Sequence, residues 1–225
     1  MLSARARGVI TSRYRRALTR TAVSAVAAGL PVVPGAWWSA SGRRFECDLA
    51  GCPRTGPHPA VHHDPATGPP GAGLMVHALR DREAVPARWT RQPYTVLVPT
   101  GEACDVVDVP AHLGRALATR LDARSALGPV ISAGSRWFFL AAPGGQLAAV
   151  GGDVLVHGHG SWIMLPPSLG PGGSPTRWLV RPARYGWELP ERDVVIRALA
   201  PVSVPVQRST LPSGAAIRQV SATPA

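Results

Sequence analysis

Glycine and proline set the strongest limit on what this chain can fold into. Each occurs 24 times in 225 residues, and their combined share is roughly double ordinary usage. Both residues interrupt helices, and proline also interrupts central strands. The sequence therefore favours short elements joined by many turns, in one domain or one domain with a tail. With 45% hydrophobic residues, the chain can still bury a core, which excludes global disorder.

The charge of the chain is strongly one-sided. Arginine supplies all 24 basic residues against 13 acidic ones, so the formal net charge is +11. A GC-rich coding sequence explains the lack of lysine, but it does not explain the excess of positive charge. A domain with this charge attracts polyanions. The charge alone does not tell specific from non-specific attraction.

Short helical and strand patterns follow one another and predict an α+β fold with a mixed or antiparallel sheet. Helices are expected over residues 13–29, 111–123 and 190–199. Expected strands are residues 30–33, 94–99, 104–109, 129–131, 137–141, 154–156, 162–165 and 177–180.

The domain is expected to span residues 13–200, between a flexible N-terminus (1–12) and a flexible C-terminal tail (201–225). Inside it, residues 35–73 lack periodicity and are rich in proline and glycine. They predict a long loop, and a loop of this length is usually functional or held by a bound group.

The arginine-rich N-terminus precedes an apolar stretch at residues 21–34. This pattern fits either a mature amphipathic helix or an export signal, and the small residues and Pro31 in the stretch favour the helix. No window reaches the roughly 18 apolar residues of a membrane span. Three cysteines do not fit a paired disulfide framework. We therefore expect a cytoplasmic protein with no membrane partner.

Two cysteines and a histidine cluster in the long loop. Cys47, Cys52 and His58 are spaced like the ligands of a metal knuckle, although more loosely than a Cys-x-x-Cys pair, and they are candidate ligands of a structural zinc ion. The fourth ligand remains open, with His62, His63 and Cys104 as candidates. The alternative is two unrelated free thiols in a flexible loop.

Two aspartates lie in the predicted strand 104–109. Carboxylates such as Asp105 and Asp108 near a strand end commonly hold Mg²⁺ or Mn²⁺ for phosphoryl transfer. Residues at i and i+3 point to opposite faces of a regular strand, so the spacing argues against a metal pair. The alternatives are Asp105 in a turn and Asp108 as the N-cap of the following helix.

Arginine and aromatic residues interleave late in the domain, as in Arg177 and Trp178. This composition is typical of a groove for single-stranded nucleic acid. It is equally typical of arginine stems that cover the edge of a core. The glycine-rich segment 170–174 lacks the pattern of a phosphate-binding loop and predicts a hairpin turn. Candidate contacts to nucleic acid or nucleotide are Arg136, His157, His159, Ser168, Arg177 and Trp178.

Several short motifs follow one another in a distinctive order. They are Gly29-Leu-Pro-Val-Val-Pro34, the Cys47…Cys52…His58-Pro59 loop, Trp89, Val98-Pro-Thr-Gly101, Asp105-Val-Val-Asp-Val-Pro110, Gly128-Pro-Val130, and Trp162…Pro166-Pro-Ser168 with Trp178 behind. This order resembles the bifunctional primase/polymerase N-terminal domain of the archaeo-eukaryotic primase superfamily, over roughly residues 15–182. The resemblance implies an RRM-like α+β core with an N-terminal helix-strand module and the Cys/His loop.

The resemblance also implies a site for two divalent ions. The family pattern has an Asp-x-Asp pair, a histidine on a following strand, and a further acidic residue before the Pro-Pro-Ser strand. Asp108 falls on the first aspartate position, but Pro110 occupies the second. Trp137 stands where the histidine is expected, and the later acidic position falls near Leu155, with Asp153 two residues away.

These departures predict lost or altered catalysis, because proline and tryptophan cannot ligate a metal. In addition, Phe45 stands where the Cys/His loop of the family has one more cysteine. Our main hypothesis is a catalytically degenerate primase/polymerase-like protein that binds nucleic acid or nucleotide. One alternative is an active primase/polymerase that uses Mg²⁺ or Mn²⁺ in a rearranged site of Asp105, Asp108 and Asp153. The other is a non-enzymatic module that binds a protein partner and has kept only the fold.

Overall fold

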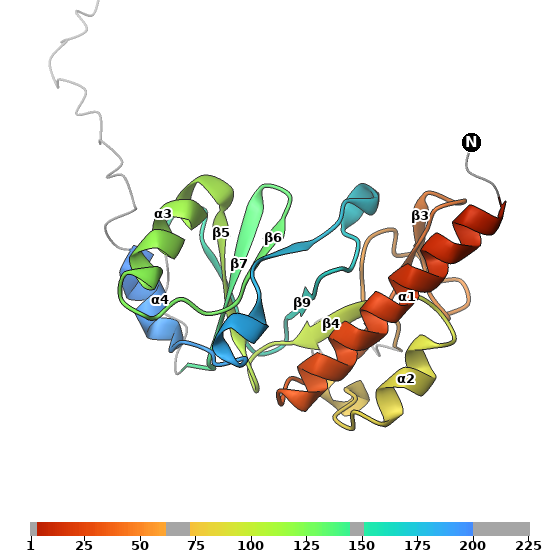
Figure 1. Ribbon diagram of the computed structural model, residues 1–225, viewed down its shortest axis with the longest axis horizontal. Coiled ribbons are helices and arrows are strands. Elements are labelled where there is room, and N and C mark those ends of the chain that lie inside the picture. The colour runs from red at the N-terminus through yellow and green to blue at the C-terminus, as the bar shows by residue number, and fades with distance from the viewer. Residues whose placement is uncertain (1–3, 62–72, 145–150, 200–225) are drawn as a thin grey trace, which may run out of the picture.

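The computed structural model describes residues 4–61, 73–144 and 151–199 and has the expected α+β fold. Figure 1 shows two larger sheets side by side, with α1 and α2 beside one and α3 and α4 beside the other. Every strand pair in the described sheets is antiparallel. Of the two sheet types expected, the antiparallel one is therefore observed.

The larger sheet has five strands in the order β10-β6-β7-β5-β8. α3 (Ala111–Asp122) and α4 (Arg192–Leu199) pack against each other and against β5 and β7. The strand bounds are β5 (Asp105–Pro110), β6 (Val130–Ala133), β7 (Arg136–Ala141), β8 (Leu155–His157) and β10 (Arg177–Val180).

Alternation along β5 sends its side chains into two separate cores. Val107 and Val109 are fully buried in a cluster with Leu117 of α3 and Val195 of α4. Val106 is fully buried in a second cluster, which includes residues of α1 and α2. Because neighbouring residues of a strand point to opposite faces, the five-stranded sheet is covered on one face by α3 and α4 and joins the rest of the molecule through the other.

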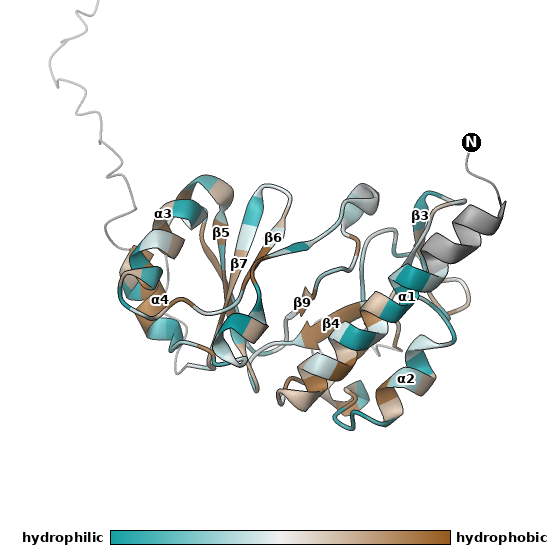
Figure 2. Ribbon diagram, in the orientation of Figure 1, coloured by the Kyte–Doolittle hydropathy of each residue, from teal (hydrophilic) through white to brown (hydrophobic). Residues whose placement is uncertain are grey.

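The smaller sheet has three strands in the order β1-β4-β9. Its central strand is fully buried, and Figure 2 shows hydrophobic residues along it. From α1, Leu18, Ala22 and Ala25 recur at helical spacing and are fully buried in this core. The bounds are α1 (Ala4–Ala27), α2 (Ala84–Trp89), β1 (Val33–Gly35), β4 (Thr95–Pro99) and β9 (Trp162–Met164).

The prediction of a long loop over residues 35–73 is wrong for the first part of that segment. Residues 37–46 form a β-hairpin of β2 (Trp37–Ser39) and β3 (Arg44–Glu46). Trp38 lies opposite Phe45, and their rings meet edge to face with centroids 5.3 Å apart. This cross-strand aromatic pair stabilises the hairpin, and three-residue strands are too short to show an alternating pattern.

Several element boundaries also differ from the expected ones. α1 begins at Ala4 rather than at residue 13. The first strand spans Val33–Gly35 rather than 30–33, although Val32 already forms a bridge with Leu79. A 3-10 turn (Leu74–His77) and α2 were not expected. The C-terminal tail lies outside the described residues. Among the helices that are described, none has both the length and the apolar character needed to cross a membrane.

Candidate functional site

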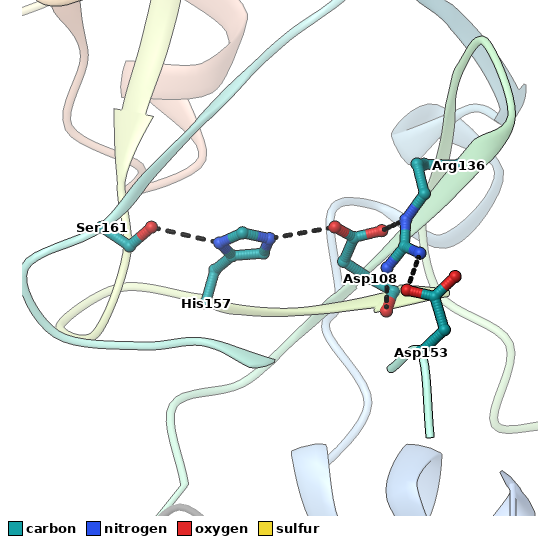
Figure 3. A network of polar contacts seen from close by, with 5 residues as sticks. All are labelled: Asp108, Arg136, Asp153, His157 and Ser161. Atoms are coloured by element: carbon teal, nitrogen blue, oxygen red, sulfur yellow. Dashed lines mark hydrogen bonds and ion pairs between the residues drawn. The ribbon is translucent and has the colours of Figure 1, made fainter. Parts of the chain in front are cut away.

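A network of charged side chains surrounds Asp108 on the five-stranded sheet (Figure 3). Nε of Arg136 donates to Oδ1 of Asp108 over 2.7 Å, and its Nη2 donates to the Asp108 carbonyl over 3.2 Å. Nη1 of Arg136 donates to Oδ1 of Asp153 over 2.8 Å. One guanidinium therefore pairs with two carboxylates. Asp108 is only 5% exposed, so this pairing takes place at the edge of the protein interior.

Strand register determines these contacts. Asp108 of β5 lies opposite Phe138 of β7 on one side and opposite Leu155 of β8 on the other. Arg136 is two residues from Phe138, and His157 is two residues from Leu155. Because residues two apart share a face of a sheet, the side chains of Arg136 and His157 lie diagonally across from Asp108 on the same face.

The pairing also changes the acid–base character of Arg136. Burial by itself lowers the pKa of this guanidinium, but the hydrogen bonds and negative charges of Asp108 and Asp153 raise its pKa above the ordinary value. Arg136 is therefore a permanent cation within this site.

His157 links Asp108 to the second sheet. Its Nε2 lies 3.2 Å from Oδ2 of Asp108, and its Nδ1 lies 3.1 Å from Oγ of Ser161. The expected strand 154–156 ends just before His157, whereas the structure places His157 half-buried in β8. Ser161, just before β9, was not predicted as part of the site. Because Thr100 donates its N–H to the Ser161 carbonyl over 3.0 Å, the chain of contacts joins the two sheets.

The order Ser161–His157–Asp108 resembles the nucleophile, base and acid of a hydrolase. Asp108, however, is already neutralised by Arg136. The Ser161 N–H donates to the carbonyl of Gly158 over 3.2 Å, so it is not available to stabilise an oxyanion. The Ser161–His157–Asp108 contacts therefore support a structural role, in which they bridge β8 and the start of β9.

Asp105 is not part of this network. Its Oδ2 accepts hydrogen bonds from Nη1 of Arg192 over 2.8 Å and from the Gly144 N–H over 3.0 Å. The side chains of Asp105 and Arg192 are 3% and 2% exposed. The structure thus places Asp105 and Asp108 on opposite faces, as their spacing predicts. Neither alternative role holds: Asp105 begins β5, and the N-cap of α3 is Pro110.

Trp137, at the position expected for a catalytic histidine, faces away from Asp108. A Cβ built on Gly114 of α3 would lie 2.6 Å from its ring, so Trp137 packs under that helix. Its neighbour Arg136 approaches Asp108 instead. At the later acidic position, Leu155 is 52% exposed beside Asp108. With Trp137 turned away, the Asp108 carboxylate is flanked by the guanidinium of Arg136 and the apolar side chain of Leu155.

The Cys/His loop brings its three candidate ligands together. One ligand atom from each of Cys47, Cys52 and His58 lies within 4.8 Å of the others. Sγ of Cys52 is 3.4 Å from Nε2 of His58, while Nδ1 of His58 is 2.7 Å from the Gly56 carbonyl. A carbonyl at Nδ1 leaves Nε2 free to act as a ligand, and this is the usual arrangement of a metal-binding histidine. The group can hold a metal ion.

Burial sets the protonation of these ligands. It raises the pKa of the Cys47 thiol and lowers the pKa of His58. His58 therefore favours the neutral form that binds metals, whereas the thiol keeps its proton until a metal displaces it. Of the candidates for a fourth ligand, Cys104 is buried in the core and is not in the group, and His62 and His63 lie outside the described residues.

The remaining candidate residues occupy different surroundings. Ser168 is fully buried, and its hydroxyl accepts the Val96 N–H over 3.0 Å, so it anchors β4. His159 is exposed at the turn before β9. Arg177 and Trp178 of β10 line a groove beside α1. None of these four contacts the Asp108 network in any recorded hydrogen bond or ion pair.

Comparison with known proteins gives one match. The model of the family described as bifunctional DNA primase/polymerase, N-terminal, matches residues 22–192. No curated protein and no solved structure matches the chain. The family match covers most of the chain and includes both sheets, the Cys/His group and the Asp108 network. The chain therefore belongs to the bifunctional DNA primase/polymerase N-terminal family.

Proposed function

We propose that this chain is a catalytically inactive primase/polymerase-like protein that binds nucleic acid or nucleotides. The contact between Arg136 and Asp108 carries the proposal. Nucleotidyl transfer in this family needs divalent ions beside the first aspartate, where they bridge the reacting oxygens. In this chain, a guanidinium 2.7 Å away already neutralises that carboxylate.

The positions around Asp108 support the loss of metal binding. Pro110 and Leu155 replace two carboxylates that the family pattern places there, and neither side chain can ligate a metal. Asp153 is exposed, and its carboxylate pairs with the same guanidinium. A fixed cation can balance the charge of a carboxylate, but it offers no exchangeable coordination positions for a primer hydroxyl or a triphosphate.

The geometry also argues against a rearranged active site. Such a site needs Asp105, Asp108 and Asp153 to converge on one ion. Asp105 instead forms a buried ion pair with Arg192, on the face covered by α3 and α4. Nucleic-acid binding, in contrast, needs only positive surface, and a net charge of +11 provides it.

The test is an assay of primer synthesis and primer extension with Mn²⁺ or Mg²⁺, together with binding of a labelled oligonucleotide across a salt series. We expect no nucleotide incorporation, and binding that weakens steeply with salt. Incorporation that Asp108→Ala abolishes would show that catalysis survives. No binding at low salt, with capture of a defined protein partner, would favour an interaction module instead.

We propose further that the metal of the Cys/His group is zinc and that its role is structural. Two thiolates and an imidazole are the donors that zinc prefers. Ligands of a tetrahedral zinc ion lie about 3.5 Å apart, and the Cys52–His58 distance already fits. The ion would hold the segment after β3, which contains few regular elements.

Metal analysis of the purified protein tests this assignment. We expect one zinc per chain, and we expect Cys52→Ser to lose most of it because two protein ligands hold zinc weakly. Cys104→Ala is the matched control, because Cys104 lies outside the group, and it should keep its zinc. A full complement of zinc in Cys52→Ser would contradict the assignment.

A further inference from the structure

A groove runs between α1 and the segment that follows β9. One wall is formed by Ala17, Arg20, Thr21 and Ser24, which share one face of α1 at helical spacing. The facing wall comes from β10 and from the 3-10 turn Pro182–Tyr185 with its flanking residues. The groove has a volume of about 660 Å³, a size typical of small-molecule sites. None of its lining residues belongs to the Asp108 network.

The groove is positively charged. Arg20 projects from α1, and Arg177 and Arg181 line the facing wall. All three are exposed, and no aspartate or glutamate lines the groove. Within the part of the chain that the structure describes, no ion pair involves any of the three. Arg136 and Arg192, in contrast, pair with carboxylates. The groove arginines are therefore available to an anion from outside.

Two tryptophans complete the facing wall. The rings of Trp178 and Trp187 meet edge to face, with centroids 6.1 Å apart, and both residues are half-buried. Trp187 has φ of +67°, which bulky residues rarely adopt. Its N–H donates to the Pro182 carbonyl over 3.1 Å. This unusual backbone turns a large aromatic side chain towards the groove, and the surrounding structure holds it there.

The walls of the groove are tied together by hydrogen bonds. Thr21 of α1 donates its hydroxyl to the Pro166 carbonyl over 2.9 Å. Pro166 and Pro167 line the groove between its walls. Beyond them, the hydroxyl and N–H of Thr176 both donate to the Ser168 carbonyl, over 2.8 and 3.0 Å. The groove is thus preformed, and a ligand would not have to order it.

We infer that this groove binds a nucleotide unit, with the arginines contacting phosphate and the tryptophans contacting the base. Guanidinium groups suit phosphate oxygens, and an aromatic ring suits an unstacked base of any sequence. The inference rests on the proposed nucleic-acid binding and gives it a location outside the Asp108 network. The unit can belong to a single strand or be a free nucleotide, since both carry the same groups. Duplex DNA fits poorly, because its bases are stacked and paired.

The experiment measures fluorescence anisotropy of labelled dT20 with the full chain across a salt series. Arg20→Ala and the double variant Arg177→Ala/Arg181→Ala test the two walls independently. The matched control is Arg115→Ala/Arg124→Ala, which removes the same charge from exposed residues on or just beyond α3. We expect each groove arginine that contacts phosphate to lower the salt slope by about 1, while the control changes the slope little.

Trp178→Phe and Trp178→Ala test the base contact. Phenylalanine keeps a stacking ring, whereas alanine removes it and should weaken binding about tenfold. Competition by unlabelled dTTP identifies a free nucleotide as ligand, and failure of dTTP to compete identifies a strand. A duplex competitor should be weaker than dT20.

Two results separate the inference from the proposed function. If the wild-type chain does not bind dT20 at low salt, the proposed binding function fails. If it binds, but the groove variants and the α3 control lose the same affinity and slope, the proposed function stands and the groove is not the site. Equal binding of the duplex, unaffected by Trp178→Ala, would also overturn the inference.

Discussion

Arginine has three different roles in this chain, and its surroundings decide among them. Arg192 is buried and pairs with Asp105, which leaves neither charge unpaired in the interior. Arg136 is partly buried and pairs with both Asp108 and Asp153. Arg177 and Arg181 are exposed beside tryptophans. Residue type alone predicts a cation in each case, and only burial and neighbours tell a structural arginine from one that can bind a ligand.

Cys104 shows the effect of burial on a single ionisable group. Its side chain is fully buried. Burial, with a smaller contribution from the charge of Asp105, raises its pKa from 9.0 to about 12. The unfolded chain therefore loses this proton at lower pH than the folded chain does. The contribution of the protonated Cys104 thiol to the free energy of unfolding is therefore fully present below pH 9. It is lost as the pH rises from 9 towards 12.

We predict that the stability advantage of wild type over Cys104→Ala shrinks between pH 9 and 11. The expected change is at most about 1.4 kcal/mol per pH unit, the value for one proton. Urea unfolding of both proteins at several pH values measures it. Tyr14 and Tyr94 also have pKa values raised to about 12, but their contribution is common to both proteins and cancels. Parallel pH profiles would contradict the prediction.

At the scale of elements, α3 sits close to the sheet because it has a glycine where it crosses β7. Gly114 is buried, and an added Cβ would lie 2.6–2.9 Å from the ring atoms of Trp137. Glycine usually weakens a helix by about 1 kcal/mol relative to alanine. Here it makes room for the tryptophan, and this packing keeps Trp137 on the helix side of the sheet, away from Asp108.

We predict that Gly114→Ala lowers the free energy of unfolding by about 1–3 kcal/mol through overpacking, despite the better helix propensity of alanine. Denaturant unfolding measures this change. Combining Gly114→Ala with Trp137→Leu should remove the clash, so the glycine exchange then becomes neutral or stabilising. Ala116→Gly, at an exposed position of the same helix, should cost only about 1 kcal/mol. A stabilising effect of Gly114→Ala in the wild-type background would show that α3 adjusts without strain.

At the scale of the whole molecule, the two larger sheets meet at Ser161. The His157–Ser161 contact and the Thr100–Ser161 hydrogen bond join them. The groove beside α1 lies between the N-terminal helix and the last strand of the five-stranded sheet. Residues of α1 and residues of the segment 166–187, far apart in the sequence, therefore line one groove. This groove exists only once the two larger sheets and α1 have packed together.

Much of this architecture could be predicted from the sequence. The apolar runs near residues 95–99 and 105–110, and the helix after Pro110, follow directly from period and composition. The β2–β3 hairpin could not be predicted, because its strands are only three residues long and its aromatic residues pack across the strands and against Tyr94. The contact between His157 and Asp108 was missed for a similar reason. Periodicity indicates the face on which a residue lies, but not which strand is its neighbour.

The sequence by itself determined the α+β class, the order of the motifs that mark the family, the opposite faces of Asp105 and Asp108, and the Cys47–Cys52–His58 group. These depend on residue type, spacing and contacts close in sequence. Tertiary structure decided which side chains contact each carboxylate. Arg136 and His157 lie 28 and 49 residues from Asp108, and the strand order β7-β5-β8 brings them together. Long-range packing also built the groove from segments that contribute no aspartate or glutamate to its lining, so among the described residues its arginines form no ion pair.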